Sequence, residues 1–304
     1  MFNPMGRNYP SFELLTQRPA NLGKVFFVDS GGSDDNEGTD PNFPMKLMTT
    51  AIAKCNSVDH GDTIVVMQES PGSPTSGETW PILINKPGIL LTGLYSRGLV
   101  SDSGFSSTPV NTNCINIANG TNFVSVENLY LQTLTGTTTG DVVSCPTVGG
   151  AAIYGFTMRN CVISIQNACR YGFYTNSNVD WPYLLIEDCQ FGSAVGSYMT
   201  NAIRIWNATY GIIRRNLFGW CSSYAMYGLG NGGFYNILDN KFNLSANTAG
   251  FAIQLDSGSQ AILVDGNSAT SQKTATGVSV YTDASSGGNR WGNNYAGIVA
   301  VLSS

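Results

Sequence analysis

A six-residue frame recurs along the middle and end of the chain, and it constrains the fold more than any other feature. The frame reads apolar, polar, polar, Asn or Cys, variable, large apolar. Its copies begin at Met158, Ile186, Ile213, Ile237 and Val264, the last with a degenerate end, and an earlier relative begins at Val126. Successive starts are 32, 28, 27, 24 and 27 residues apart. Self-similarity at a period of roughly 20 to 50 residues is typical of proteins built from stacked repeats.

A second set of apolar positions advances in step with this frame. It comprises Ile203 and Ile205, Met226, Ile253 and Leu255, Val278 and Val280, and Ile298 and Ala300. Most of them alternate with other residues, as a strand with one buried face requires. Two strands that advance together describe a coil whose turns stack, so each strand pairs in parallel with its counterpart one turn away. The sequence therefore predicts an all-β fold, a single-stranded right-handed parallel β-helix.

The fourth position of the frame predicts an asparagine ladder at one corner of the coil. The column contains Cys161, Cys189, Asn216, Asn240, Asn267 and Asn289. Amides stacked about 4.8 Å apart can form hydrogen bonds from turn to turn. The seven cysteines have irregular spacing without a CxxC pair. This pattern favours buried free thiols over a disulfide framework or a zinc site.

Charged residues are scarce and fall into columns. They make up 12% of the chain, with a net charge of −5 and 15 scattered Lys and Arg. Such a chain offers no electrostatic footprint for nucleic acid, and no apolar stretch approaches the roughly 18 residues that span a membrane. The second frame position places Glu127, Arg159, Glu187 and Arg214 on successive turns. Alternating signs in such a column compensate one another across adjacent strands.

The N-terminal part of the chain differs from the repeats. Residues 1–23 are rich in Pro, Asn and aromatics without periodicity, which predicts an extended arm. Residues 24–304 form the expected β-helix domain, opened by strands at 24–29 and 63–67. Between these strands, apolar residues at helical spacing over about 45–55 predict an amphipathic helix. Such a helix would cap the open end of the coil.

Few residues indicate catalysis. The chain has one histidine, His60, and no nucleotide-binding loop, so neither a Ser-His-Asp triad nor a cofactor or metal site is expected. The acidic loop 34–40 is expected to be hydrated, with calcium binding as the alternative.

One pair of carboxylates is placed as an acid and base would be. Asp188 and Asp239 occupy one column two turns apart, about 9.6 Å at a coil spacing of about 4.8 Å. That separation is at the upper limit for the two carboxylates of glycoside hydrolases. Arg215 lies between them, so a structural salt-bridge ladder is favoured over catalysis.

Aromatic residues gather in the middle turns. They are Trp181, Tyr183, Trp206, Tyr210, Trp220, Tyr224 and Tyr227. Exposed rings of this kind line sugar-binding grooves, whereas buried rings fill cores and subunit interfaces. Core or interface packing is favoured here, with glycan contact as the alternative.

Three segments within the first 70 residues resemble a known group of proteins. Residues 3–12 read Asn-Pro-Met-Gly-Arg-Asn-Tyr-Pro-Ser-Phe, residues 25–30 read Val-Phe-Phe-Val-Asp-Ser, and residues 61–66 read Gly-Asp-Thr-Ile-Val-Val. They resemble β-helical virion proteins of tailed bacteriophages, and the second part is shared widely among pectate-lyase-like β-helices. The resemblance implies a homotrimer that serves either as a capsid decoration (cement) protein or as a tailspike acting on host polysaccharide.

The favoured hypothesis is a structural virion protein without enzymatic activity. It would be made in the host cytoplasm and would stabilise the phage head as a trimeric capsid decoration protein. Its arm, with Arg7, Tyr9 and Phe12 as anchors, would contact the major capsid protein. The repeats run almost to the C-terminus, unlike in spikes with a C-terminal receptor domain. The alternative is a tailspike-like receptor-binding protein or depolymerase acting on host surface polysaccharide, with Asp188 and Asp239 as acid and base.

Overall fold

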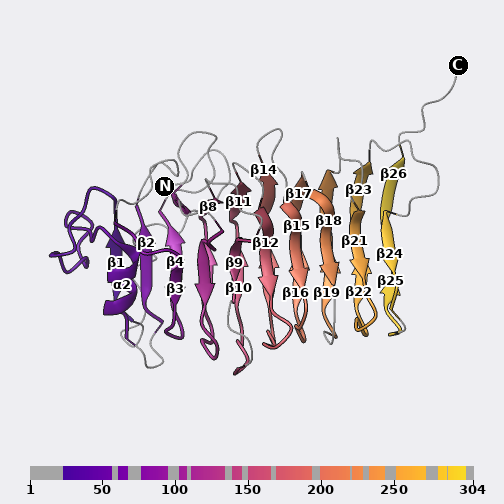
Figure 1. The fold of residues 1–304 in the computed structure, drawn as a ribbon, viewed down its shortest axis with the longest axis horizontal. Coiled ribbons are helices and arrows are strands. Elements are labelled where there is room, and N and C mark those ends of the chain that lie inside the picture. Colours follow the sequence, from indigo (N-terminus) through magenta and orange to yellow (C-terminus); the bar gives the residue numbers. More distant parts are fainter. Residues whose placement is uncertain are drawn as a thin grey trace, which may run out of the picture.

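The computed structural model describes residues 23–56, 61–67, 77–94, 103–107, 111–133, 139–145, 150–165, 169–193, 199–219, 221–228, 233–243, 251–271, 280–285 and 287–298. Within these residues the chain winds into a row of stacked coils, from β1 (Val25–Val28) to β26 (Tyr295–Ile298) (Figure 1). Strands of neighbouring coils pair in parallel. The predicted all-β parallel β-helix is confirmed.

Three sheets, called A, B and C, make up the described part of the solenoid. The ten strands of sheet A are β1, β2 (Thr63–Val66), β4 (Leu90–Gly93), β7 (Ser125–Glu127), β10 (Thr157–Arg159), β13 (Leu185–Glu187), β16 (Ile212–Arg214), β19 (Asn236–Leu238), β22 (Leu263–Asp265) and β25 (Arg290–Trp291). The eight strands of sheet B are β3 (Ile82–Ile84), β6 (Ile115–Ile117), β9 (Asp141–Ser144), β12 (Cys169–Thr175), β15 (Met199–Ile205), β18 (Cys221–Gly228), β21 (Phe251–Leu255) and β24 (Tyr281–Asp283). The eight strands of sheet C are β5 (Gly104–Ser107), β8 (Tyr130–Thr133), β11 (Val162–Ile165), β14 (Gln190–Ser193), β17 (Leu217–Gly219), β20 (Lys241–Asn243), β23 (Ser268–Ser271) and β26.

The first and sixth positions of the repeat frame build the core. The buried first-position residues of sheet A, aligned in register, are Val126, Met158, Ile186, Ile213, Ile237 and Val264. In sheet C, the sixth position stacks Phe191, Phe218 and Phe242, with ring centroids 5.1 and 4.8 Å apart. Aromatic pairs of this kind contribute about 0.5–1.5 kcal/mol each beyond burial. The repeat thus places one apolar side chain per coil at equivalent points of the core.

The short corner from sheet A to sheet C uses the third frame position. The residues there have φ between 52° and 67°, and they are Asn128, Asn160, Asp188, Arg215, Asp239 and Gly266. Glycine, asparagine and aspartate enter this left-handed region more readily than other residues. The corner geometry therefore accounts for most residue types found at this position.

The asparagine ladder follows directly after this corner position. The side-chain amide of Asn216 donates to Oδ1 of Asn240 at 3.0 Å. Asn240 donates in the same way to Asn267 at 3.0 Å, and Asn267 to Asn294 at 2.9 Å. At the head of the ladder, Oδ1 of Asn216 accepts the backbone N–H of Cys189 at 2.9 Å. The ladder therefore ties successive coils together through side chain and backbone.

Asn289 lies outside the ladder, which corrects the sequence prediction. Its Oδ1 accepts the backbone N–H of Ile262 at 3.0 Å, on the entry side of the sheet A strand. Trp291 pairs with Val264 and is therefore the first frame position of the last coil. The fourth position falls three residues after Trp291, at Asn294, so strand pairing decides which asparagine joins the column.

Helix α2 (Met48–Lys54) contacts β1, β2 and β3 at the N-terminal end of the solenoid (Figure 1). It lies within the range 45–55 suggested by the apolar spacing, and Met48, Ala51 and Ile52 are its buried residues. The carboxylate of Glu78 accepts the backbone N–H groups of Met48 at 2.7 Å and Thr49 at 3.2 Å. These donors have no carbonyl partner within the helix, so Glu78 completes its first turn.

The anchors proposed for the N-terminal arm, Arg7, Tyr9 and Phe12, lie outside the described residues. Among the residues that are described, no helix is long and apolar enough to cross a membrane.

Candidate functional site

The carboxylates considered as an acid–base pair, Asp188 and Asp239, both lie at the corner between sheets A and C. Arg215 donates to both oxygens of Asp188, at 2.9 Å to Oδ1 and 2.8 Å to Oδ2. Asp239 is exposed at the equivalent corner position two coils further on. Asp188 is thus held in a bidentate ion pair by an arginine from the intervening coil. This geometry is that of a structural ladder.

Glu187 extends the charge ladder along sheet A. Its Oε1 accepts from Arg159 at 2.6 Å, and its Oε2 accepts from Arg214 at 2.7 Å and Arg215 at 2.8 Å. Arg159 also lies 3.8 Å from Glu127. Burial would raise the pKa of Glu187, but the hydrogen bonds from Arg214 and Arg159 outweigh this effect and lower the pKa. The charges here compensate one another and stabilise the coil.

Three adjacent strands of sheet B are long, with seven residues in β12, seven in β15 and eight in β18. They carry a cluster that we call the sheet-B platform: Tyr171, Tyr174, Arg204, Trp206, Tyr224 and Tyr227. Tyr174, Arg204 and Tyr227 are direct neighbours in register across three coils. The residue before each of the three is buried, so these side chains point outward.

Arg204 lies at the centre of the sheet-B platform. Its guanidinium carbon is 5.0 Å from the ring centroid of Tyr171, 5.3 Å from Trp206 and 5.6 Å from Tyr227. A terminal nitrogen contacts the hydroxyl of Tyr171. Its Nε is buried without a hydrogen-bond partner, and no ion pair among the described residues includes Arg204. Arg204 is partly exposed and carries a charge that no described carboxylate pairs, so its guanidinium is suited to receive an anionic ligand.

The groups that flank Arg204 already have partners. Buried Asp141 accepts from Arg170 at 2.9 and 2.7 Å, and burial raises the pKa of Asp141 against these hydrogen bonds. On the other side, the hydroxyl of Tyr227 donates to Asp256 at 2.9 Å. Burial and this carboxylate raise the pKa of Tyr227 to about 12, so its phenol stays protonated. Arg204 is therefore the group of the platform best placed to bind an anion.

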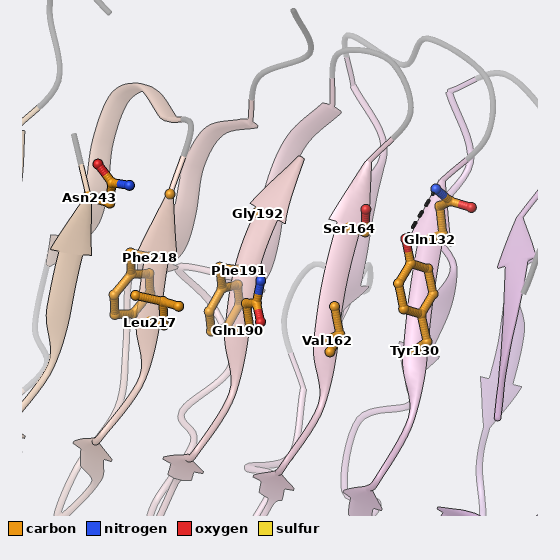
Figure 2. A pocket seen from close by; sticks show the side chains of 11 residues that line it. Tyr130, Gln132, Val162, Ser164, Gln190, Phe191, Gly192, Leu217, Phe218 and Asn243 are labelled. Atoms are coloured by element: carbon orange, nitrogen blue, oxygen red, sulfur yellow. Dashed lines mark hydrogen bonds between the residues drawn. The ribbon is translucent and has the colours of Figure 1, made fainter. Parts of the chain in front are cut away.

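A second surface feature is an open trough of about 420 Å³ on the outer face of sheet C (Figure 2). This sheet-C trough is lined by Tyr130, Gln132, Val162, Ser164, Gln190, Phe191, Gly192, Leu217, Phe218, Gly219 and Asn243. Its outward residues come from the fifth frame position and from the position two residues later, in register across neighbouring coils. The lining offers amides, hydroxyls and apolar groups, and none of its side chains is charged.

The aromatic residues highlighted by the sequence fall into different environments. Trp181 is buried in the core, Tyr183 and Tyr210 stack on each other at an exposed corner, Trp206, Tyr224 and Tyr227 belong to the sheet-B platform, and Trp220 lies outside the described residues. Tyr171, Tyr174 and Arg204 are not among the residues that the sequence pattern indicated. The run Tyr-Gly-Phe-Tyr at 171–174 is the signal for them, because it places two tyrosine rings on one strand beside an arginine of the next coil.

Two carboxylates of the acidic loop accept hydrogen bonds from backbone groups that follow the loop. Oδ1 of Asp34 accepts the backbone N–H of Leu47 at 2.9 Å, and Oδ1 of Asp40 accepts that of Asn42 at 2.8 Å. Within the described residues, no group of three or more His, Cys, Asp or Glu side chains is placed to hold a metal ion. His60 lies outside the described residues.

Comparison with known proteins concerns the fold. No protein-family model matches the chain, and no curated protein matches its sequence. The chain is similar to the solved structure of a pectin methylesterase from Aspergillus niger, with 12% identity, coverage of 92% of this chain and 87% of that chain, and a TM-score of 0.49. It is also similar to a rhamnogalacturonan lyase, with 14% identity, 82% and 68% coverage and a TM-score of 0.47. A surface adhesin of Streptococcus pneumoniae gives 12% identity, 78% and 69% coverage and a TM-score of 0.44.

These comparisons correct one expectation from the sequence. A protein without enzymatic activity was the favoured hypothesis, but pectin methylesterase, rhamnogalacturonan lyase, alginate lyase and pectate lyase are enzymes with a similar fold. The expectation of a non-enzyme is therefore contradicted. Sequence identities of 10–14% relate these proteins by fold and not by substrate.

Proposed function

We propose that the chain binds an acidic polysaccharide through the sheet-B platform. The observation that carries this proposal is Arg204, which is partly exposed, lies among three aromatic rings and belongs to no ion pair among the described residues. The carboxylate of an acidic sugar would supply the missing ion-pair partner. A guanidinium binds carboxylates through two parallel hydrogen bonds, which adds geometric selectivity to the charge attraction.

The rings around Arg204 suit the remainder of such a sugar. Tyr174, Trp206 and Tyr227 are partly exposed, and each combines an apolar ring with a polar tip. A pyranose ring likewise has apolar C–H faces and a polar rim. Coils about 4.8 Å apart present outward side chains at a spacing comparable to the length of one sugar unit. The platform therefore fits a polymer that runs along the solenoid.

The biological role that we propose is recognition of host surface polysaccharide by a tailed-phage virion. The chain would act as a trimeric, tailspike-like receptor-binding protein or depolymerase. The motifs at residues 3–12, 25–30 and 61–66 support the phage assignment. The capsid-decoration role favoured by the sequence depends on an arm whose anchors lie outside the described residues.

The test is binding of the full chain to polygalacturonate and alginate, measured by calorimetry with dextran as a neutral polymer. Arg204→Gln is expected to lower the affinity for the acidic polymers about tenfold or more, because a hydrogen bond to a charged group contributes about 1.5–3 kcal/mol. Arg290→Gln is the matched control, since it removes the same charge from an exposed residue of sheet A.

Two outcomes would contradict the proposal: the wild-type chain binds no acidic polysaccharide, or Arg204→Gln loses no more affinity than Arg290→Gln. The release of reducing or unsaturated chain ends from the same polymers distinguishes a depolymerase from a receptor-binding protein.

A further inference from the structure

Two strand glycines of sheet C occupy positions where the fold does not require glycine. At Gly172 in sheet B, a Cβ would lie 2.7 Å from the backbone oxygen of Ala202, so glycine is needed there. At Gly192, a Cβ would meet no atom of the described residues within 4 Å, and at Gly219 the nearest such atom is the backbone oxygen of Phe191 at 3.9 Å. Neither Gly192 nor Gly219 has a positive φ. Both positions have space for a side chain.

These two glycines form the floor of the sheet-C trough. Gly192 pairs with Ser164 of one neighbouring coil, and Gly219 pairs with Asn243 of another. Glycine inside a regular element is destabilising by about 0.5–1 kcal/mol relative to alanine. In strands it often marks a place where a ligand approaches the backbone closely. Packing does not require glycine at these two positions. The effect of having glycine there is that no side chain fills the bottom of the trough.

The walls of the trough carry groups that both donate and accept hydrogen bonds. Gln132, Gln190 and Asn243 supply amides, and Ser164 and Tyr130 supply hydroxyls. Figure 2 shows the amide of Gln132 directed at the hydroxyl of Tyr130, at 3.5 Å. An amide satisfies a ligand hydroxyl in either of its roles, as donor or acceptor.

We propose that the sheet-C trough binds a neutral saccharide chain that lies along the solenoid axis. Val162 and Leu217 lie in the same row as Gln190 and offer apolar contact to the C–H faces of sugar rings. The absence of charged side chains from the lining selects against uronates, sulfates and phosphates. The trough extends from β8 to β20, which suits a chain better than a compact ligand. Its volume is within the range of about 300–1,000 Å³ typical of ligand sites.

This site is separate from the sheet-B platform. It lies on another sheet and takes a neutral ligand, so it does not rest on the proposed function. The effect of Arg204→Gln on the binding of acidic polysaccharide and the effect of trough substitutions on the binding of neutral saccharide can therefore be measured independently.

The test uses the full chain on an array of neutral oligosaccharides without carboxylate, sulfate or phosphate groups, followed by calorimetry with the oligosaccharide that gives the strongest signal. Gly192→Val fills open space and is expected to weaken binding about tenfold or more while leaving the melting temperature unchanged or higher. Ser268→Val is the matched control, because Ser268 lies in the outward row of sheet C beyond the trough. A second variant, Gln190→Ala, removes an amide of the wall and is expected to weaken the same binding.

Loss of binding in Gly192→Val and Gln190→Ala, with binding retained in Ser268→Val and Arg204→Gln, supports the proposal. It is overturned if no neutral oligosaccharide binds the wild-type chain or if Gly192→Val binds as the wild type does. Light scattering gives a further decisive result. If Gly192→Val lowers the oligomeric state, the trough is an interface between copies of this chain, and the saccharide proposal fails.

Discussion

Asn240 and Asn267 are joined through a single oxygen that accepts two hydrogen bonds. Oδ1 of Asn267 accepts the side-chain amide of Asn240 at 3.0 Å and also the backbone N–H of Asn240 at 3.0 Å. Asn240 accepts the same pair of hydrogen bonds from Asn216. All three residues are buried. Each asparagine therefore satisfies backbone and side-chain groups of its neighbour and links adjacent coils at the corner.

Replacing the central member of this ladder is expected to destabilise the fold. Asn240→Ala removes the acceptor of the Asn216 backbone N–H and the donor to the carbonyl of Ile213. Each buried group left without a partner costs about 1–3 kcal/mol, so we expect the free energy of unfolding to fall by about 3 kcal/mol. Urea denaturation measures this change. Lys241→Ala, at the exposed neighbour, should change it by less than about 0.5 kcal/mol; equal effects of both variants would contradict the ladder's role.

The charge ladder predicts an acid-sensitive contribution to stability. The pKa of Glu187 is lowered in the folded state by Arg214 and Arg159. Its contribution is therefore fully present above the unfolded pKa of about 4.3 and is lost as the pH falls through the lower, folded pKa. We expect Glu187→Gln to lower the free energy of unfolding at neutral pH by about 1–2 kcal/mol, since the arginines are partly exposed and solvent screens them.

The measurement is a series of urea denaturations from about pH 7 to pH 3. The wild-type chain should lose more stability over this range than Glu187→Gln does, because the variant lacks the titrating group. Glu37→Gln, in the exposed loop, serves as the control with the same change of charge. Parallel pH profiles of wild type and Glu187→Gln would rule out this contribution.

The thiols are expected to be unreactive in the folded protein. All seven cysteines are buried and none forms a disulfide, and burial raises the pKa of Cys221 to about 12. Because the thiolate is the reactive form, a chromogenic disulfide reagent at about pH 8 should modify these cysteines only on unfolding. Seven thiols should then titrate in guanidinium chloride. Ser222→Cys, at the exposed neighbour of Cys221, should react in the native state; rapid reaction of the native wild-type chain would refute the prediction.

The repeat frame predicts the core correctly because every coil must fill an equivalent cross-section. Residues such as Ile186, Ile213 and Ile237 recur at the first position and stack in register. The frame fails at the last coil, where its degenerate copy suggests Asn289 for the ladder. The pairing of Val264 with Trp291 selects Asn294 instead, and this pairing depends on the length of the preceding connection.

The candidate sites carry no comparable signal. Tyr174, Arg204 and Tyr227 share one column but are separated by 30 and 23 residues and have different side chains. Side chains that point outward do not pack in the core, so the same residue type need not recur at these positions from coil to coil. The sequence shows that aromatic residues gather in the middle turns. Only the strand register shows that several of their rings surround Arg204, which has no ion-pair partner among the described residues.

The sequence by itself determined the parallel β-helix, its inward-facing residues and most of its asparagine ladder, because burial in a repeating cross-section imposes the same residue types on each coil. Only the tertiary structure decided which outward side chains meet. It paired Asp188 with Arg215, gathered the rings around Arg204, and opened a trough over Gly192. The physical reason is that chemistry on the surface depends on neighbours from different coils, whose relative positions are set by strand pairing and connection length.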